Sequence, residues 1–142
     1  MNKVAISLAK RFEGYSFKPY LCPAKVLTAG YGHAFKPGET VRSLFLDEAE
    51  VVLAQDLAIA ARGAFRLCPG LLKESEGRQG AVIDFVFNLG SGRLKASTLR
   101  RRINQKDWDA VIYELKRWVR GGGKILKGLV RRREAEAKFF ES

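Results

Sequence analysis

Hydrophobic residues recur at helical spacing in the first dozen residues of the chain. Val4, Leu8 and Phe12 stand four residues apart, which places them on one face of a helix. Gly14 is the residue type that commonly follows a helix C-terminus. The pattern therefore predicts a helix over residues 2–12, with Glu13 at its C-terminal end.

After Gly14 the helical period stops, and turn residues separate short apolar runs. These turn residues are Pro19, Pro23, Gly30, Gly32 and the Pro37-Gly38 pair. Runs such as Val26 to Thr28 are typical of the short strands of a hairpin. We therefore expect Thr28 on a short strand and Cys22 just before a turn.

Two longer helices are predicted next. Asp47, with Glu50 three residues later, resembles a capping box that opens a helix ending near Arg66. Its apolar stripe would be Leu46, Ala49, Leu53, Leu57, Ala60 and Ala64. Cys68-Pro69-Gly70 would end this helix.

Residues 79–89 are apolar almost all round, so this second helix should form a buried centre. Gly90 and Gly92 would stop it. Asp84 is the exception within it, and we expect it to form an ion pair with a nearby arginine.

The sequence of the C-terminal third predicts three further helices. Ser97 and Asp107 are N-cap residues of two of them. The second has an apolar stripe of Trp108, Val111, Ile112, Leu115 and Val119. We interpret Gly121 to Gly123 as a flexible break before a last basic helix over residues 128–140.

The length and the net charge of the chain limit the classes of protein to which it can belong. A chain of 142 residues fits one domain with its own core, and no apolar run reaches the roughly 18 residues of a membrane span. The N-terminus also lacks the apolar stretch of a signal peptide, so we expect the chain to accumulate in the cytoplasm of the cell that makes it. The net charge of +11 favours a polyanionic partner, whether nucleic acid, anionic lipid or the carboxylate-bearing bacterial cell wall.

Two arginine triplets contribute to this charge, at residues 100–102 and 131–133. Because adjacent residues on a helix point in different directions, we expect solvated helix faces at both places. Attraction to an anionic wall or membrane surface is the functional alternative. The two cysteines, Cys22 and Cys68, should remain reduced in a cytoplasmic protein, and Cys68 should pack as a small apolar residue.

The candidate chemistry centres on Glu13. At a helix C-terminus the macrodipole is negative, which disfavours the glutamate anion and suits a general acid. The plain alternative is a solvated glutamate at a helix end. Eight residues separate Glu13 from Cys22 and five separate Cys22 from Thr28, whose thiol and hydroxyl could hold a water opposite the acid.

This arrangement resembles the catalytic loop of the bacteriophage lysozymes (endolysins) of glycoside hydrolase family 24. Their pattern is Glu, eight residues, Asp or Cys, five residues, Thr, then a turn like the Gly-Tyr-Gly-His at residues 30–33. Stretches at 84–92, 97–104 and 108–136 resemble the same family in the same order, so the resemblance covers essentially the whole chain.

The resemblance implies an α+β lysozyme-like fold, with a small N-terminal β-hairpin lobe and a mostly helical C-terminal lobe, forming a single catalytic domain over residues 1–142. It implies hydrolysis, with inversion, of the bond between N-acetylmuramic acid and N-acetylglucosamine in peptidoglycan. Glu13 would protonate the leaving oxygen, and Cys22 and Thr28 would position the attacking water. Phe87, Asn88 and Thr98 match family positions near the bound sugar. For Phe87 and Asn88 a core aromatic and a helix-end residue are the plain alternatives, and Thr98 needs no ligand at a capped helix start.

The same resemblance implies an enzyme without metal or cofactor, since protonation and a positioned water suffice. We expect a monomer that acts on peptidoglycan, touches anionic membrane at most transiently and binds no nucleic acid. A separate holin would release it from the host cytoplasm.

Cys22 departs from the aspartate of most of the family. A free thiol is mostly protonated at neutral pH, so we interpret Cys22 as a group that orients water rather than as a thiolate base. Three alternatives stay open. They are a lytic transglycosylase that uses one acid and no water, a cysteine hydrolase pairing Cys22 with His33, and a basic nucleic-acid-binding protein. For His33 we favour a structural, hydrogen-bonded role in its turn.

Overall fold

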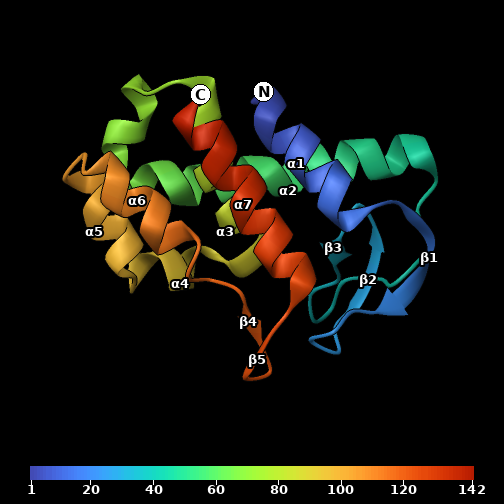
Figure 1. Cartoon of the computed structure of the whole chain (residues 1–142). Helices are drawn as coiled ribbons and strands as arrows, with labels where there is room; N and C mark the ends of the chain where they lie inside the picture. The colour runs from blue at the N-terminus through green and yellow to red at the C-terminus, as the bar shows by residue number, and fades with distance from the viewer.

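The computed structural model describes residues 1–142 and shows a small antiparallel sheet beside a larger group of helices (Figure 1). The helices are α1 (Lys3–Glu13), α2 (Leu46–Leu67), α3 (Glu76–Leu89), α4 (Ser91–Lys95), α5 (Thr98–Asn104), α6 (Trp108–Leu115) and α7 (Lys127–Glu141), with a 3₁₀ helix η1 at Pro69–Lys73. The strands are β1 (Ser16–Leu21), β2 (Leu27–Gly30) and β3 (His33–Ala34), with a second hairpin of β4 (Arg120–Gly121) and β5 (Lys124–Ile125). The expected α+β arrangement is confirmed.

Helix α1 begins and ends as its sequence predicts. The Asn2 side chain accepts a hydrogen bond of 2.9 Å from the Ala5 N–H and so caps the first turn. Gly14 follows the last turn with a φ of 67°, a left-handed conformation that favours glycine. Glu13 therefore occupies the negative end of the helix dipole.

The sheet places Thr28 on its central strand. β2 pairs antiparallel with β1 and with β3, and Thr28 lies opposite Tyr20 on one side and Ala34 on the other. Cys22 follows directly on β1, and its carbonyl accepts a hydrogen bond of 2.7 Å from the Lys25 N–H. The strand position of Thr28 and the turn after Cys22 are both confirmed.

Helix α2 links the sheet to the other helices, but the expected capping box is wrong. The helix begins at Leu46, so Asp47 already lies in the first turn, where its carboxylate accepts from the Glu48 N–H at 2.9 Å. Glu48 reaches back to the N–H of the N-cap residue Phe45 at 3.3 Å, while Glu50 pairs with a lysine of α1. Leu46 does not belong to the buried stripe, because it is exposed.

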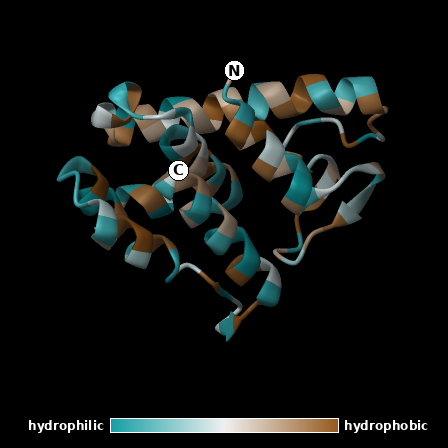
Figure 2. Ribbon diagram, turned by 45° about the horizontal axis from the view of Figure 1, so that its top comes forward, coloured by the Kyte–Doolittle hydropathy of each residue, from teal (hydrophilic) through white to brown (hydrophobic).

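Helix α3 is the buried centre of the helical lobe, as its apolar sequence predicts. It begins at Glu76, earlier than expected, because Ser75 caps it by accepting from the Arg78 N–H at 3.2 Å. It packs against α1, α2 and α7. A Cβ on Gly80 would lie 2.5 Å from Cβ of Val4, so glycine is what allows α1 to approach α3. In Figure 2 hydrophobic and hydrophilic residues alternate around most helices, which agrees with one-sided burial.

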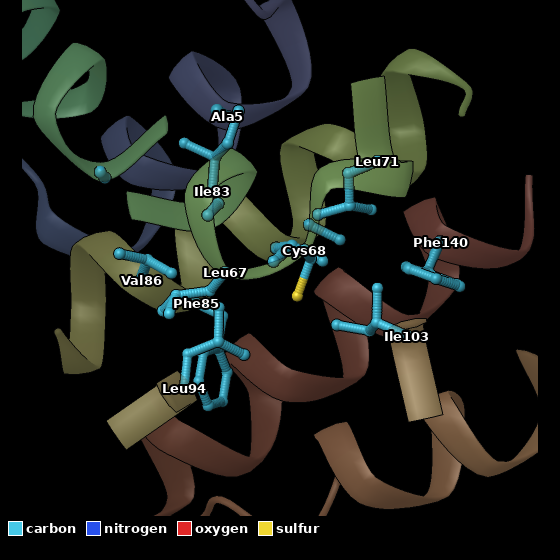
Figure 3. Packing of buried hydrophobic residues seen from close by; sticks show 14 of the residues in the cluster. Ala5, Leu67, Cys68, Leu71, Ile83, Phe85, Val86, Leu94, Ile103 and Phe140 are labelled. Atoms are coloured by element: carbon cyan, nitrogen blue, oxygen red, sulfur yellow. The ribbon is translucent and has the colours of Figure 1, made fainter. Parts of the chain in front are cut away.

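Cys68 lies in this core, with its sulfur among apolar side chains such as Leu71 and Ile103 (Figure 3). Burial raises the pKa of its thiol to about 11, so it stays protonated and inert at neutral pH. The expected packing role is confirmed. Both cysteines are free thiols.

Two helix boundaries in the second half of the chain differ from the prediction. Ser97 and Asp107 do cap α5 and α6. Gly92, however, lies inside α4, a short helix that starts directly after Gly90. α6 ends at Leu115, so Val119 is not part of its stripe.

The triple glycine forms the turn of the β4–β5 hairpin rather than a flexible break. Gly122 and Gly123 have φ angles of 59° and 79°. Two successive positive φ angles are what a tight hairpin turn of the I′ type requires. The hairpin stands beside the first turn of α7 (Figure 1).

The second arginine triplet is not a solvated face. Arg131 is exposed, but Arg132 and Arg133 retain only 4% and 0% of their accessible surface. Successive residues of α7 point in different directions, and these two point toward α3. Asp84 of α3 pairs with Arg132, and Glu136 of α7 itself pairs with Arg133, so both buried charges have an acidic partner. In the first triplet Arg101 is exposed, and Arg100 and Arg102 are half-buried.

No helix of the structure has both the length and the apolar character needed to cross a membrane.

His33 contacts Asp56 of α2 and Glu39 of the loop that precedes α2. Its Nδ1 lies 2.8 Å from Oδ2 of Asp56, and its Nε2 lies 2.7 Å from Oε2 of Glu39. Burial of His33 lowers the pKa of its imidazole, but the hydrogen bonds with Asp56 and Glu39 outweigh burial and raise it overall. The expected structural role of His33 is confirmed.

A raised pKa of His33 makes stability depend on pH. The histidine binds its proton more tightly when folded, so its contribution is fully present below the unfolded pKa of about 6.5 and is lost as pH rises through the folded value. We expect the Tm to fall as pH rises above about 6.5, and to fall less in His33→Gln. Circular dichroism melts of both proteins check this, and equal slopes for the two would contradict it.

Candidate active site

A cleft of about 710 Å³ lies between the sheet, the C-terminal end of α3 and the β4–β5 hairpin. It is lined by Glu13, Tyr20, Cys22, Pro23, Ala24, Thr28, Gly32, Ala34, Phe87, Asn88, Leu89, Arg93, Arg120, Gly121, Gly122, Leu126 and Leu129. Glu13 is the only carboxylate among these residues. Nowhere in the structure do three His, Cys, Asp or Glu side chains gather as a group that could hold a metal ion.

The structure brings five of the six predicted site residues to this cleft. Glu13, Cys22 and Thr28 line it from the sheet side, and Phe87 and Asn88 line it from α3. The sixth, Thr98, lies outside it in an adjoining groove, where its hydroxyl accepts a hydrogen bond of 3.1 Å from Arg101.

Arg132 holds Glu13 in place. Its Nη1 donates to Oε2 of Glu13 at 2.5 Å, while its Nε and Nη2 donate to the two oxygens of Asp84 at 2.9 and 2.8 Å. Burial raises the pKa of Asp84, but the hydrogen bonds from Arg132 outweigh burial and lower it overall, so Asp84 is an anion. The fork of one arginine thus connects a buried carboxylate of α3 with the cleft carboxylate of α1.

The two carboxylate partners of Arg132 differ in exposure. Asp84 takes two of the three hydrogen bonds and has no exposed surface, whereas the Glu13 side chain is 22% exposed toward the cleft. The guanidinium of Arg132 therefore has a fully buried anionic partner in addition to the carboxylate in the cleft.

Gly32 lets the polypeptide backbone pass directly beside Glu13. A Cβ at this position would lie 2.5 Å from Oε1 of Glu13 and 2.7 Å from its Cδ, closer than any real contact. Gly32 also has a φ of 72°, which disfavours other residues. The turn after β2 therefore fixes one side of the glutamate.

Cys22 and Thr28 face the cleft across a short turn. The Thr28 hydroxyl donates to the Val26 carbonyl at 2.9 Å, and the Cys22 N–H donates to the same carbonyl at 3.0 Å. A hydrogen bond with the Val26 backbone lowers the pKa of the Cys22 thiol, burial opposes this, and bonds with Ala24 and Thr28 support it. The sulfur thus lies among polar groups suited to holding a water.

The amide of Asn88 has a fixed orientation. Arg133, which is fully buried, donates from Nη2 to the side-chain oxygen of Asn88 at 2.9 Å and to Glu136 at 2.8 Å. Because arginine has donors only, the group facing it must be the amide oxygen. The NH₂ of Asn88 is then left to donate to an acceptor in the cleft.

His33 does not pair with Cys22. Both of its ring nitrogens contact carboxylates, and it lines a separate hollow with Asp56 that does not include the thiol. The structure therefore gives no support to a cysteine nucleophile activated by His33.

Three features of the site did not follow from the sequence. They are the identity of Arg132 as the partner of Glu13, the contact with Gly32 and the β4–β5 hairpin as a cleft wall. The only signals were the tandem arginines of the last helix, the Gly-Tyr-Gly turn and the three successive glycines. None of these specifies which element it will face, because that depends on packing between distant segments.

The fold and the cleft define a lysozyme-like protein. The structure superimposes on the active form of the P1 phage endolysin Lyz with a TM-score of 0.84 and 24% identity, covering 99% of this chain and 84% of that one. It is similarly close to a P22 lysozyme mutant, with a TM-score of 0.82, 24% identity and coverage of 100% and 98%.

The sequence identifies the family. Residues 10–136 match the family model of phage lysozyme. The chain is 40% identical to the SAR-endolysin of bacteriophage PS34 over 128 residues, which is 87% of this chain and 73% of the relative. It is 32% identical to the endolysin of Bacillus phage B103 over 142 residues, which covers 99% of this chain and 53% of the relative. The chain therefore belongs to the phage lysozyme family.

The contact between Gly32 and Glu13 predicts that Gly32→Ala lowers activity on bacterial cell walls by about a hundredfold. The added Cβ must displace the one carboxylate of the cleft, and a displacement of about 1 Å within an active site has effects of this size. Gly38→Ala is the matched control, since Gly38 has a φ of 86° with nothing within 4 Å of its Cβ position. Turbidity clearing and thermal melts of both variants check this. If Gly32→Ala and Gly38→Ala had the same activity and the same Tm, the contact between Gly32 and Glu13 would have no effect on activity.

The buried pair of Asp84 and Arg132 predicts that Asp84→Asn lowers the free energy of unfolding by about 3–5 kcal/mol, because it leaves a buried charge undercompensated. Urea unfolding measures the loss. Glu134→Gln is the control. Glu134 lies on the same helix as Arg132, but its carboxylate is exposed and forms no hydrogen bond, so its loss should lower the free energy of unfolding by less than about 1 kcal/mol. An equally small loss for Asp84→Asn would show that the pair of Asp84 and Arg132 contributes little to stability.

Proposed function

We propose that the chain is an endolysin that hydrolyses the β-1,4 bond between N-acetylmuramic acid and N-acetylglucosamine in peptidoglycan and so lyses the host cell. The observation that carries this is the position of Glu13, a cleft carboxylate held by Arg132 and facing the polar pair of Cys22 and Thr28. Membership of the phage lysozyme family supports the same substrate class.

In the proposed reaction Glu13 is the general acid. It protonates the glycosidic oxygen as the bond to the anomeric carbon breaks, and Arg132 then stabilises the resulting carboxylate. Asp84 meanwhile keeps Arg132 oriented through two hydrogen bonds. The attacking water loses a proton to solvent, and Glu13 takes up a proton from solvent before the next cycle.

Cys22 and Thr28 position the attacking water. The water would lie on the opposite face of the sugar from Glu13, so the reaction inverts the anomeric centre. The hydrogen bonds around the Cys22 sulfur suit it to orient the water rather than to attack the sugar. No metal or cofactor has a role in this scheme.

Phe87 and Asn88 bind the sugar in this proposal. Phe87 offers a half-buried ring to the face of a sugar, and the fixed NH₂ of Asn88 donates to a sugar or acetamido oxygen. Thr98 contributes from the adjoining groove rather than from the cleft itself.

Residues 1–142 would act as one catalytic domain and as a monomer. Release from the host cytoplasm would depend on a separate holin. We propose no nucleic-acid partner, and contact of the basic surface with anionic membrane would be transient.

A lytic transglycosylase is the second candidate. The observation that favours it is the single carboxylate of the cleft, because a transglycosylase needs one acid and no activated water. Its products would end in anhydro-muramic acid, whereas hydrolysis gives reducing ends.

Mass spectrometry of fragments released from purified peptidoglycan tests the proposal. We expect reducing-end muramic acid fragments from the wild type and a rate at least a hundredfold lower for Glu13→Gln, because general acid catalysis contributes about that much or more. We expect Cys22→Asp to keep substantial activity, since aspartate can also hold the water.

Anhydro ends would replace the hydrolytic mechanism with transglycosylation. A Cys22→Asp variant that folds, as judged by its circular dichroism spectrum and Tm, but releases no fragments would overturn the proposed role of Cys22.

A further inference from the structure

A buried ion pair of α7 lies behind the cleft and takes no part in the proposed reaction. Nε of Arg133 lies 2.7 Å from Oε1 of Glu136, and Nη2 lies 2.8 Å from Oε2. Neither side chain has any exposed surface. The two residues stand three positions apart on one helix, so their pairing does not join two elements of the fold.

Stability gives little reason for this pair. Removing two charges from water often costs more free energy than their attraction returns, and apolar residues of similar volume are commonly as stable in such places. Nη1 of Arg133 is also buried without a hydrogen-bond partner, which adds to the cost. The position of the pair is therefore a better reason for it than stability.

Arg133 connects the core with a group in the cleft. Its Nη2 donates to Glu136 and also to the side-chain oxygen of Asn88 at 2.9 Å. Asn88 is half-buried and lines the cleft from the end of α3. The buried pair thus ends on a side chain that a bound strand would touch.

The preceding arginine has the same arrangement. Arg132 donates to Asp84 in the core and reaches Glu13 in the cleft. Arg133 repeats this pattern one residue later, with a carboxylate in the core and an amide in the cleft. Two successive residues of α7 therefore each hold one cleft group from behind.

Glu136 fixes the orientation of the Arg133 guanidinium. The hydrogen bonds of this guanidinium go to Glu136 and Asn88, and the ring of Phe85 lies beside it with its centroid at 5.1 Å. Without Glu136 the long side chain would be free to turn. Asn88 would then lose the charged donor that holds its amide oxygen toward the core.

We propose that Glu136 is a positioning residue for substrate binding. Through Arg133 it holds the NH₂ of Asn88 in the cleft, ready to donate to an oxygen of the bound glycan strand. This inference rests on the proposed function, because it assumes that the cleft takes peptidoglycan. A donor that is already oriented loses less freedom on binding than a free amide, so the effect falls on affinity.

Initial rates on solubilised peptidoglycan, measured over a range of concentrations, test the proposal. In Glu136→Leu we expect the half-saturating concentration to rise about fivefold and kcat to change less than about twofold, because one net hydrogen bond to the strand is lost. Asn88→Ala should give the same rise. Adding Glu136→Leu to Asn88→Ala should raise it no further, since Glu136 acts through Asn88.

A second variant removes the risk of misfolding. Glu136→Leu leaves the charge of Arg133 buried without its partner, whereas Arg133→Met/Glu136→Leu replaces both charges with apolar side chains. This double variant should fold and show the same fivefold rise, roughly the value of one hydrogen bond.

Asn88→Asp tests the direction of the hydrogen bond by itself. Aspartate keeps an acceptor for Arg133 but presents an oxygen to the cleft in place of the NH₂. We expect this variant to bind the strand at least as poorly as Asn88→Ala. A wild-type half-saturating concentration in Asn88→Asp would overturn the inference.

Leu71→Ala controls for lost stability. Leu71 is fully buried in η1 and lies outside the cleft, so its truncation lowers the Tm without changing the site. Measured below the Tm of every variant, Leu71→Ala should keep the wild-type half-saturating concentration.

Three results would contradict the role of Glu136. They are a wild-type half-saturating concentration in Arg133→Met/Glu136→Leu, a loss confined to kcat, and a further rise when Glu136→Leu is added to Asn88→Ala. A wild type that releases no fragments from peptidoglycan would instead mean that the proposed function itself has failed.

Discussion

The arrangement of the site depends on one buried arginine. Arg132 leaves α7 toward α3, where Asp84 binds it through two hydrogen bonds, and its remaining Nη1 reaches Glu13 at the end of α1. Three helices that are distant in sequence thereby meet at a single guanidinium. Burying this charge is costly, and only the two carboxylates make it tolerable. The same contacts that stabilise the helical lobe therefore fix the position of the glutamate.

The sheet side of the cleft is set by close packing rather than by charge. Gly32 allows the turn after β2 to pass against Glu13, and Thr28 lies on the central strand opposite Tyr20. The His33 bridge to Asp56 fastens this turn to α2. The small lobe can thus present Cys22 and Thr28 to the cleft although it has little core of its own.

The arginines of the chain fall into two groups, which differ in burial and in pairing. Arg132 and Arg133 are buried and paired, and they orient Glu13 and Asn88. Arg93, Arg117 and Arg120 beside the cleft are exposed, and of these only Arg117 has a carboxylate partner, Glu114. The net charge of +11 predicts a polyanionic partner, but it does not distinguish cations that build the site from cations that face it.

The sequence by itself determined the local features. The apolar spacing and Gly14 placed Glu13 at a helix end, the capping residues Ser97 and Asp107 marked two helix starts, and the apolar run of α3 marked the core. Such features depend on residues within a few positions of each other, so they can be predicted without a fold. The family resemblance supplied the other expected site residues. Thr98, one of these, lies outside the cleft in an adjoining hollow.

Only the tertiary structure decided which distant groups meet. The partner of Glu13, the burial of two arginines of one triplet and the hairpin made by three glycines all depend on contacts between segments far apart in the chain. The spacing of residues along α7 gives their directions but not what lies in each direction. That is set when α1, α3 and α7 pack together, because burial and ion pairing are properties of the packed chain.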